Sequence, residues 1–373
     1  MTPGIAATQR VAIDSEIAAL FSFHDRAGTY VFTQRSSRWP GQGTREWVNR
    51  KAASWWAIKS EPADGLTLLK KEVKMSSANQ FVTPFTLESQ PYIFGLHERG
   101  VNIWRIEPQS GLKLVLGKGQ MSPNYRHVVA FQRCGRPYIL GLHEDVGANI
   151  WSIESAPSDR VSFHLLTPPE SRIPMSHHYE HLTMFYAYNR AHIFGLHRDQ
   201  GAWIWRVKDD PAQGLDLVTR GAAFPHSYNY VLPFHLNGRA YLAGLVSENY
   251  MDALADAPAL PAGGPEMFPG TEFIFEILEK TVELTVEWGK GYGCIWSIEG
   301  PPDALSLKKI SKTFPISHEY SRMTAFEQGG SAYIFGVHKE NYANIWKISD
   351  DPSTGFSLIY YGKTGRNVSK QPT

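Results

Sequence analysis

The sequence has little cysteine, no excess of either charge and no long apolar run. Its two cysteines, Cys134 and Cys294, fall at non-equivalent positions of an internal repeat, so we expect two free thiols and no disulfide framework. Lysine and arginine number 37 against 36 acidic residues, which leaves no electrostatic signature of a nucleic-acid or anionic-membrane partner. No run of 18 apolar residues occurs, so we expect no membrane span.

Familiar sequence signatures are missing as well. Residues 1–20 have neither the basic start nor the apolar core of a signal peptide, although a secreted chain whose signal had been removed would look the same. Both a cytoplasmic and a secreted location therefore stay open. We find no nucleophile elbow, phosphate loop, dinucleotide fingerprint or paired-carboxylate signature, and we expect no cofactor.

What the sequence does contain is one unit repeated six times. Residues 138–153 read YILGLHEDVGANIWSI, and three similar copies cover residues 92–106, 192–207 and 333–348. Two further copies are interrupted, one running from 241–246 to 294–298 and the other from 30–32 to 55–58. The tryptophans that align in the six copies are Trp56, Trp104, Trp151, Trp205, Trp296 and Trp346. Their spacings of 48, 47, 54, 91 and 50 residues are typical of propeller blades.

The third copy shows what one unit contains. Four short segments rich in β-branched and aromatic residues, 125–131, 137–143, 149–154 and 160–166, are separated by polar turns, which predicts four antiparallel strands. Six such units predict an all-β, six-bladed propeller forming a single domain over residues 1–373. The expected blades cover approximately residues 15–74, 75–121, 122–175, 176–224, 225–314 and 315–363.

Most repeated residues are expected to be structural. Each tryptophan should fill the junction between two blades, because its large side chain can bury a wide area there. The glycine of the repeated G-L-H triplet should allow neighbouring strands to approach closely. A phenylalanine also precedes the first residue of every copy by seven positions: Phe23, Phe85, Phe131, Phe185, Phe234 and Phe326.

The segments that lead into the first strand of each blade are polar and similar to one another. They share one rim of the propeller with the turn after G-L-H, and we call this the top rim. The segments contain Tyr125, His127, His178, Tyr179, His181, Tyr228, Tyr230, His318, Tyr320 and Arg322. The G-L-H histidines His97, His143, His197 and His338 should lie nearby.

Three interpretations of this group remain open. The histidines and tyrosines can bond to backbone between blades, which is a purely structural role. They can hold a metal, but no HExxH motif or carboxylate-rich triad accompanies His177, His178 and His181, and we predict no metal site. They can instead bind an organic ligand through aromatic faces and a few polar groups, which suits the composition best.

Two insertions break the regularity of the repeat. Residues 33–54 in the first copy and the 47 residues 247–293 in the fifth replace short turns on the top rim. The longer insertion is rich in aromatic residues, and long loops in compact folds are usually functional or disordered. We therefore expect a lid over a single site, with Trp47, Phe268 and Trp288 closing it.

The repeated G-(x)n-N-I-W-[RKS]-[IV] pattern resembles propeller lectins of the tectonin and fungal fucose-lectin kind. The resemblance covers nearly the whole chain and implies a sugar ligand, although the Arg/Glu/Trp site of the fucose lectins does not recur here. A fainter similarity is to fungal natural-product propellers, including hetero-Diels–Alderases, and implies an enzyme of secondary metabolism.

These observations give two main hypotheses of function. The first is a cofactor-independent cyclase or pericyclase acting on an aromatic or terpenoid-like molecule, because such reactions need orientation and polarisation more than covalent catalysis. Its catalytic residues would be His178, Tyr179, His181, Tyr228, Tyr320 and Arg322. Its substrate-binding residues would be Tyr125, His127, Tyr230, His318, Trp47, Phe268 and Trp288. The alternative is a lectin with sites repeated between blades; a protein-interaction scaffold is a third, weaker option.

Overall fold

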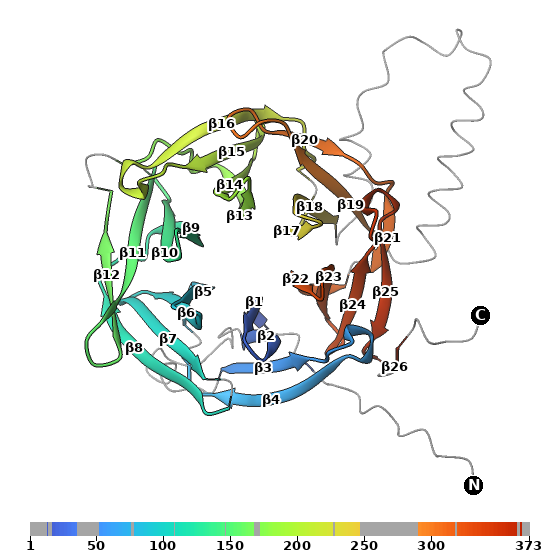
Figure 1. Ribbon diagram of the computed structural model, residues 1–373, viewed down its shortest axis with the longest axis horizontal. Coiled ribbons are helices and arrows are strands. Elements are labelled where there is room, and N and C mark those ends of the chain that lie inside the picture. The colour runs from blue at the N-terminus through green and yellow to red at the C-terminus, as the bar shows by residue number, and fades with distance from the viewer. Residues whose placement is uncertain are drawn as a thin grey trace, which may run out of the picture.

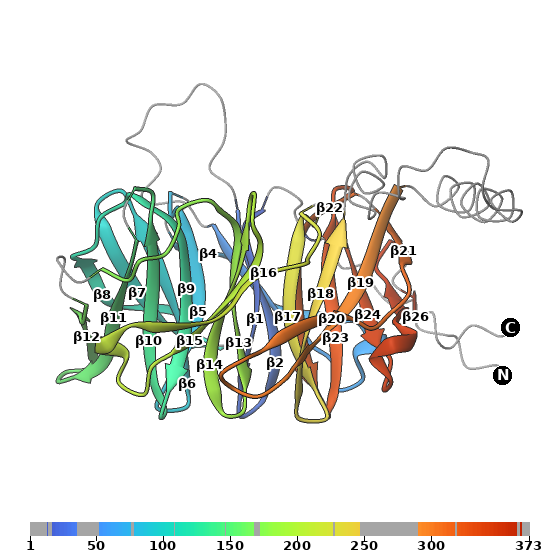
Figure 2. The same ribbon diagram turned by 90° about the horizontal axis from the view of Figure 1, so that it is seen from above.

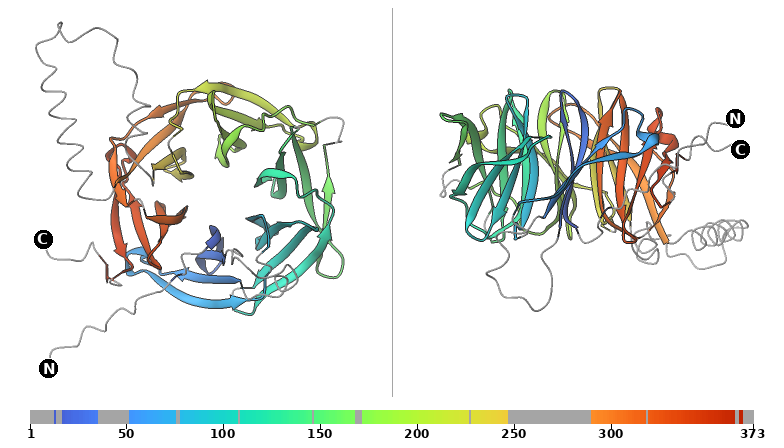
Figure 3. Two further views of the ribbon diagram at one scale, coloured as in Figure 1. Left: turned by 180° about the vertical axis from the view of Figure 1, so that it is seen from behind. Right: turned by 90° about the horizontal axis from the view of Figure 1, so that it is seen from below.

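The protein is a ring of six antiparallel sheets around a central axis, as predicted (Figure 1). The computed structural model describes residues 13, 17–35, 52–75, 78–107, 109–145, 147–167, 172–226, 228–246, 290–317, 319–363 and 366–367. Each blade contains four consecutive strands, and the first strand of each lies nearest the axis (Figures 1 and 3). The prediction of an all-β, six-bladed propeller is confirmed.

The strands follow one another in chain order. Blade 1 contains β1 (Ile17–Asp25), β2 (Gly28–Arg35), β3 (Ala53–Ile58) and β4 (Leu66–Val73). Blade 2 contains β5 (Phe81–Leu87), β6 (Gln90–His97), β7 (Gly100–Glu107) and β8 (Gly111–Gly119). Blade 3 contains β9 (Tyr125–Arg133), β10 (Arg136–His143), β11 (Ala148–Ala156) and β12 (Arg160–Leu165).

The second half of the ring repeats this order with small additions. Blade 4 contains β13 (Tyr179–Ala187), β14 (Arg190–His197), β15 (Gly201–Val207) and β16 (Leu215–Ala222). Blade 5 contains β17 (Tyr230–Leu236), β18 (Arg239–Val246), β19 (Lys290–Glu299) and β20 (Ser306–Lys309), with β21 (Phe314–Ser317) also pairing with β19. Blade 6 contains β22 (Tyr320–Gln328), β23 (Ser331–His338), β24 (Tyr342–Ile348), β25 (Phe356–Tyr361) and the two-residue β26 (Arg366–Asn367).

The repeated phenylalanines set the register of the first two strands in every blade. Each lies directly across from the first aromatic or histidine of the repeat, as Phe131 does from Tyr138 and Phe185 from His192. The six ring pairs are stacked, with centroids 4.9 to 5.3 Å apart. Cross-strand aromatic pairs of this kind stabilise a sheet and oppose a shift of register.

Six hydrophobic cores hold the ring together, and each is shared by two neighbouring blades. Trp151 of blade 3, for example, packs among Tyr92, Phe94 and Ile103 of blade 2. All six repeated tryptophans are buried in this way, none more than 8% exposed. Their predicted role at the blade junctions is confirmed.

The G-L-H glycines have a different neighbour from the one predicted. A Cβ on Gly195 would lie 2.6 Å from the ring of Tyr179, and one on Gly244 would lie 2.5 Å from the ring of Tyr228. Gly141 and Gly336 stand in the same relation to Tyr125 and Tyr320, at 2.7 Å. The glycine therefore makes room for an aromatic side chain, where the sequence predicted close approach of a strand.

The strands run between two rims of the ring (Figure 2). On the top rim the first strand begins and the second ends; on the bottom rim short turns join the first strand to the second. The parts of the two insertions at residues 36–51 and 247–289, with Trp47, Phe268 and Trp288, lie outside the described residues, so the predicted lid stays a prediction. Among the residues that are described, no helix is long and apolar enough to cross a membrane.

Candidate functional site

The predicted top-rim tyrosines are buried, and their hydroxyl groups are used within the protein. Tyr125, Tyr179, Tyr228 and Tyr320 are 9%, 1%, 2% and 3% exposed. The Tyr179 hydroxyl accepts a hydrogen bond from Trp205 Nε1 at 3.2 Å, and the Tyr228 hydroxyl accepts one from Trp296 Nε1 at 3.1 Å. In blade 3, Tyr125 donates to Asn149 Oδ1 at 3.3 Å, and in blade 6 Tyr320 accepts from Asn344 Nδ2 at 2.5 Å.

Burial also changes the acidity of these phenols. It raises the pKa of Tyr125 and of Tyr179 to about 12, and it raises the pKa values of Tyr228 and Tyr320 as well. A phenol with so high a pKa is a weak proton donor near neutral pH. Packing and hydrogen bonding thus account for the four tyrosines, and their roles in catalysis and in substrate binding stay predictions.

Four other predicted site residues bind the next blade along the ring. His127 Nε2 lies 2.7 Å from the carbonyl oxygen of Tyr179, and His181 Nε2 lies 2.6 Å from that of Tyr228. Tyr230 donates to the Tyr320 carbonyl at 2.9 Å. Arg322 Nε reaches the Ala18 carbonyl at 3.4 Å and so joins the last blade to the first. Burial lowers the pKa of both histidines, which are therefore neutral donors at pH 7.

The G-L-H histidines close the turns that follow them. Nδ1 of His97, His143, His197 and His338 accepts the backbone N–H two residues later, at 3.1 to 3.2 Å. This fixes the tautomer of His197, whose Nε2 lies 3.0 Å from Ser176 Oγ and must carry the proton. His197 therefore cannot take a proton from Ser176, and the two do not form a nucleophile–base pair.

His178 is the one exposed side chain among the described top-rim candidates that has no hydrogen bond through its ring. Its ring centroid lies 3.9 Å from that of His177 and 5.8 Å from that of His197. In the described part of the chain, no three His, Cys, Asp or Glu side chains are arranged to hold a metal ion. His318 falls outside the described residues.

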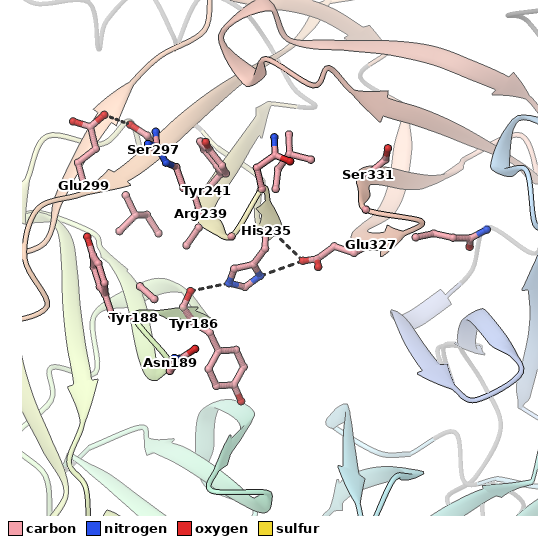
Figure 4. Close-up of a pocket in the computed structure, with 18 of the residues that line it drawn as sticks. Tyr186, Tyr188, Asn189, His235, Arg239, Tyr241, Ser297, Glu299, Glu327 and Ser331 are labelled. Carbon is pink, nitrogen blue, oxygen red and sulfur yellow. Dashed lines mark hydrogen bonds and ion pairs between the residues drawn. The ribbon is translucent and has the colours of Figure 1, made fainter.

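A large pocket lies on the opposite, bottom rim, where the sequence predicted nothing. This rim pocket has a volume of about 1240 Å³ and spans blades 4, 5 and 6 (Figure 4). Its walls are the β13–β14, β17–β18 and β22–β23 turns and the end of β19. Its volume is above the range usual for small-molecule sites, so it has room for more than one small ring.

His235 and Glu327 form the polar centre of the rim pocket. Glu327 Oε1 accepts from the His235 backbone N–H at 2.8 Å and lies 3.1 Å from His235 Nδ1. His235 Nε2 lies 2.7 Å from the carbonyl oxygen of Tyr186. Both ring nitrogens face acceptors, so only the imidazolium can donate to both. The bond to Glu327 accordingly raises the pKa of His235; burial opposes ionisation of Glu327, but the bonds from His235 outweigh it and lower that pKa.

The outer part of the rim pocket presents an exposed aromatic ring. Tyr188 is 59% exposed and donates through its hydroxyl to the Gly300 carbonyl at 2.6 Å, which holds the phenol in place. Its φ of 52° belongs to the two-residue turn between the first two strands, and Glu88 and Asn237 have the same conformation in the turns of blades 2 and 5. Glu299, which accepts from Ser297 Oγ at 2.8 Å, and the exposed Arg239 line the same space.

A sequence signal for this rim did exist. The position directly after the repeated phenylalanine is occupied by a different residue in almost every blade: His24, Thr86, Gln132, Tyr186, His235 and Glu327. Three of these side chains bond to the carbonyl of the same position one blade earlier: Gln132 to Thr86, Tyr186 to Gln132 and His235 to Tyr186. Variation at one position of a regular repeat thus marked the pocket.

Comparisons with known proteins agree with the fold. No protein-family model and no curated protein sequence matches the chain. Among solved structures, the SapL1 lectin in complex with alpha methyl fucoside is 6% identical over 92% of this chain and 96% of that one, with a TM-score of 0.50.

Two further structures are similar over most of their length. The fucose lectin of Aleuria aurantia, a six-bladed β-propeller, is 8% identical over 93% of this chain and 97% of that one, with a TM-score of 0.48. The periplasmic gluconolactonase PpgL of Pseudomonas aeruginosa is 11% identical over 91% of this chain and 83% of that one, with a TM-score of 0.48. Sequence identities this low are evidence of a shared fold alone. The chain is a six-bladed β-propeller similar to the fungal fucose-lectin propellers.

Proposed function

We propose that the protein binds a carbohydrate in the rim pocket. The observation that carries this proposal is the exposed ring of Tyr188, held beside Arg239 and Glu299 in one open pocket. An aromatic face offers an apolar surface to the C–H groups of a sugar, while carboxylate and guanidinium groups bond its hydroxyls. The similar SapL1 structure contains a methyl fucoside, which is consistent with a saccharide ligand on this fold.

The site we propose is single. Arg239 and Glu299 recur in blade 3 as Arg136 and Glu154, but Tyr188 and Glu327 stand at positions that other residues occupy in every other blade, so no other blade junction reproduces the combination. This differs from the lectin predicted from the sequence, in which sites recur between blades. Calorimetric titration should therefore give one bound saccharide per chain, and a stoichiometry near six would contradict the assignment.

A glycan array followed by titration of the best-bound sugar tests this proposal. Replacing Tyr188 by Ala should weaken binding about tenfold, which corresponds to about 1.4 kcal/mol. Glu88→Ala is a matched control, because Glu88 occupies the same position of the blade 2 turn, with a φ of 51° against 52° for Tyr188. Equal affinities of the two variants, or an array without a bound glycan, would contradict carbohydrate binding in this pocket.

The cyclase or pericyclase predicted from the sequence is the second candidate. The exposed His178 ring, packed against His177 on the top rim, is the observation that favours it. A variant lacking residues 249–289 should then lose activity on an aromatic or terpenoid-like substrate while the ring still folds. Full activity of that variant would exclude a lidded active site.

A further inference from the structure

A second, smaller cavity adjoins the proposed carbohydrate site. This axial pocket has a volume of about 280 Å³ and is lined by the innermost strands β1, β17 and β22. Glu327 is the one described residue that lines both this cavity and the rim pocket. Glu327 is therefore the residue through which a ligand of the rim pocket and the contents of the axial pocket can interact.

The two oxygens of Glu327 differ in what they bind. Oε1 accepts both hydrogen bonds from His235, one from the backbone and one from the ring. Oε2 has no partner among the residues that the structure describes, and the side chain is 48% exposed. One carboxylate oxygen is thus fixed to blade 5, and the other remains able to accept hydrogen bonds from a ligand.

Ser22 and His24 supply the other polar groups of the axial pocket. Ser22 Oγ donates its proton to the Ala325 carbonyl oxygen at 2.9 Å. Its lone pairs therefore remain able to accept a hydrogen bond from a ligand. His24 Nδ1 lies 3.0 Å from Thr29 Oγ1, and the tautomer decides whether Nε2 donates or accepts. Burial lowers the pKa of His24 despite the nearby carboxylates of Glu327 and Asp25, so its ring is neutral at pH 7.

Glu327 is the one carboxylate in the described lining of the axial pocket, and its other oxygen pairs with His235 of the rim pocket. The same lining has no lysine or arginine, and Pro233, Phe234 and Ala325 supply apolar surface around Glu327. Two acceptors, the charged Glu327 Oε2 and Ser22 Oγ, match an ammonium group, which has three donors, one positive charge and no acceptor. A hydroxyl, with one proton, would donate to only one of the two. The described residues include no three-ligand arrangement for a metal ion, which favours an organic cation.

We propose that the axial pocket holds the ammonium group of an amino sugar whose ring occupies the rim pocket. This inference rests on the proposed carbohydrate site and specifies its ligand class. Glu327 pairs with the ammonium through Oε2, while Tyr188 and the outer polar groups contact the ring.

Calorimetric titrations with D-glucosamine, N-acetyl-D-glucosamine and D-glucose test the inference. The unmodified protein should bind glucosamine at least about tenfold more tightly than the other two, as expected when a charge-assisted bond is gained. Glu327→Gln should remove this preference, because the uncharged amide cannot pair with the ammonium group. Glu299→Gln, which alters only the rim pocket, should weaken all three sugars alike.

If Glu327→Gln does not fold, a second variant tests the same inference. Ser22→Val fills part of the axial pocket, leaves Glu327 in place and should also abolish the preference for the amine. Equal binding of the three sugars by the unmodified protein would overturn the amino-sugar inference and leave carbohydrate binding intact. If neither these sugars nor any glycan of the array bound, both proposals would fail.

Discussion

The two rims of this propeller use similar residue types for opposite purposes. On the top rim, Tyr179 and His181 recur as Tyr and His in other blades, and their polar atoms bond to Trp205 and to the Tyr228 carbonyl. On the bottom rim, Tyr188 and Glu327 occur once each, and the Tyr188 ring and Glu327 Oε2 are left for a ligand. The recurring Tyr179 and His181 thus form bonds within the scaffold, whereas Tyr188 and Glu327, which occur once each, keep groups that can bind a ligand.

The largest expected effect on stability comes from a substitution on the top rim. Gly195→Ala would place a Cβ 2.6 Å from the buried Tyr179 ring, and overpacking of this kind costs about 3 kcal/mol. We expect a correspondingly lower free energy of unfolding in a denaturant titration. Gly28→Ala, at a bottom-rim turn with nothing within 4 Å of the new Cβ, is the control and should be nearly neutral. Equal stability of the two variants would show that Tyr179 is not fixed.

A smaller effect is expected when the Tyr179 hydroxyl alone is removed. Tyr179→Phe leaves Trp205 Nε1 buried without its acceptor, which costs about 1–2 kcal/mol of folding free energy. Carbohydrate affinity should stay unchanged, because the hydroxyl lies on the other rim. Thermal unfolding and calorimetric titration check the two halves of this prediction.

The control for that substitution is Tyr188→Phe, which removes an exposed hydroxyl and should change stability by less than about 0.5 kcal/mol. If Tyr179→Phe kept its stability but lost the ligand, the top rim would be the binding face and our comparison would be wrong.

The smallest effect concerns pH at the blade 5–blade 6 junction. The raised pKa of His235 makes its contribution to stability complete below the ordinary value of 6.5 and lost as pH rises through the folded value. The lowered pKa of Glu327 makes its contribution complete above 4.5 and lost as pH falls through the folded value. The pair should thus stabilise most between pH 4.5 and 6.5.

Because both side chains are partly exposed, the contribution should stay below about 1 kcal/mol. The dependence of the unfolding free energy on pH should become flatter, and by the same amount, in His235→Gln and in Glu327→Gln. A profile that kept its shape in either variant would show that the pair does not control stability here.

The sequence was sufficient for the architecture and insufficient for the site. Spacing of the tryptophans and the alternating strands predicted six blades, and the third copy gave strands close to β9–β12, because each blade is a local unit with its own turns. The polarity of Tyr179 and Tyr228 suggested a binding ring, but polarity alone does not tell whether a hydroxyl faces a ligand or an indole N–H. That difference depends on contacts with Trp205 and Trp296, far along the chain.

The bottom-rim pocket was missed for a related reason. His235, Glu327 and Tyr188 lie in three different copies, and the packing of blades 4, 5 and 6 against one another brings them to one cavity. The polar centre of the pocket stands at a position that differs between copies, the one following each phenylalanine, and not among the residues that all copies share. The pocket therefore forms only when three blades pack together, and the sequence of a single repeat does not predict it.

The sharing of each core by two blades has a consequence for synthesis of the protein on the ribosome. The core containing Trp56 and Phe335 joins blade 1 to blade 6, and Ser22 bonds to Ala325 across 303 positions of chain. Until blade 6 has emerged, the nascent chain is an open arc whose first blade exposes the apolar face that will later contact the last. The N-terminal blade must therefore wait longest for its partner, and cellular chaperones have the most reason to protect that face.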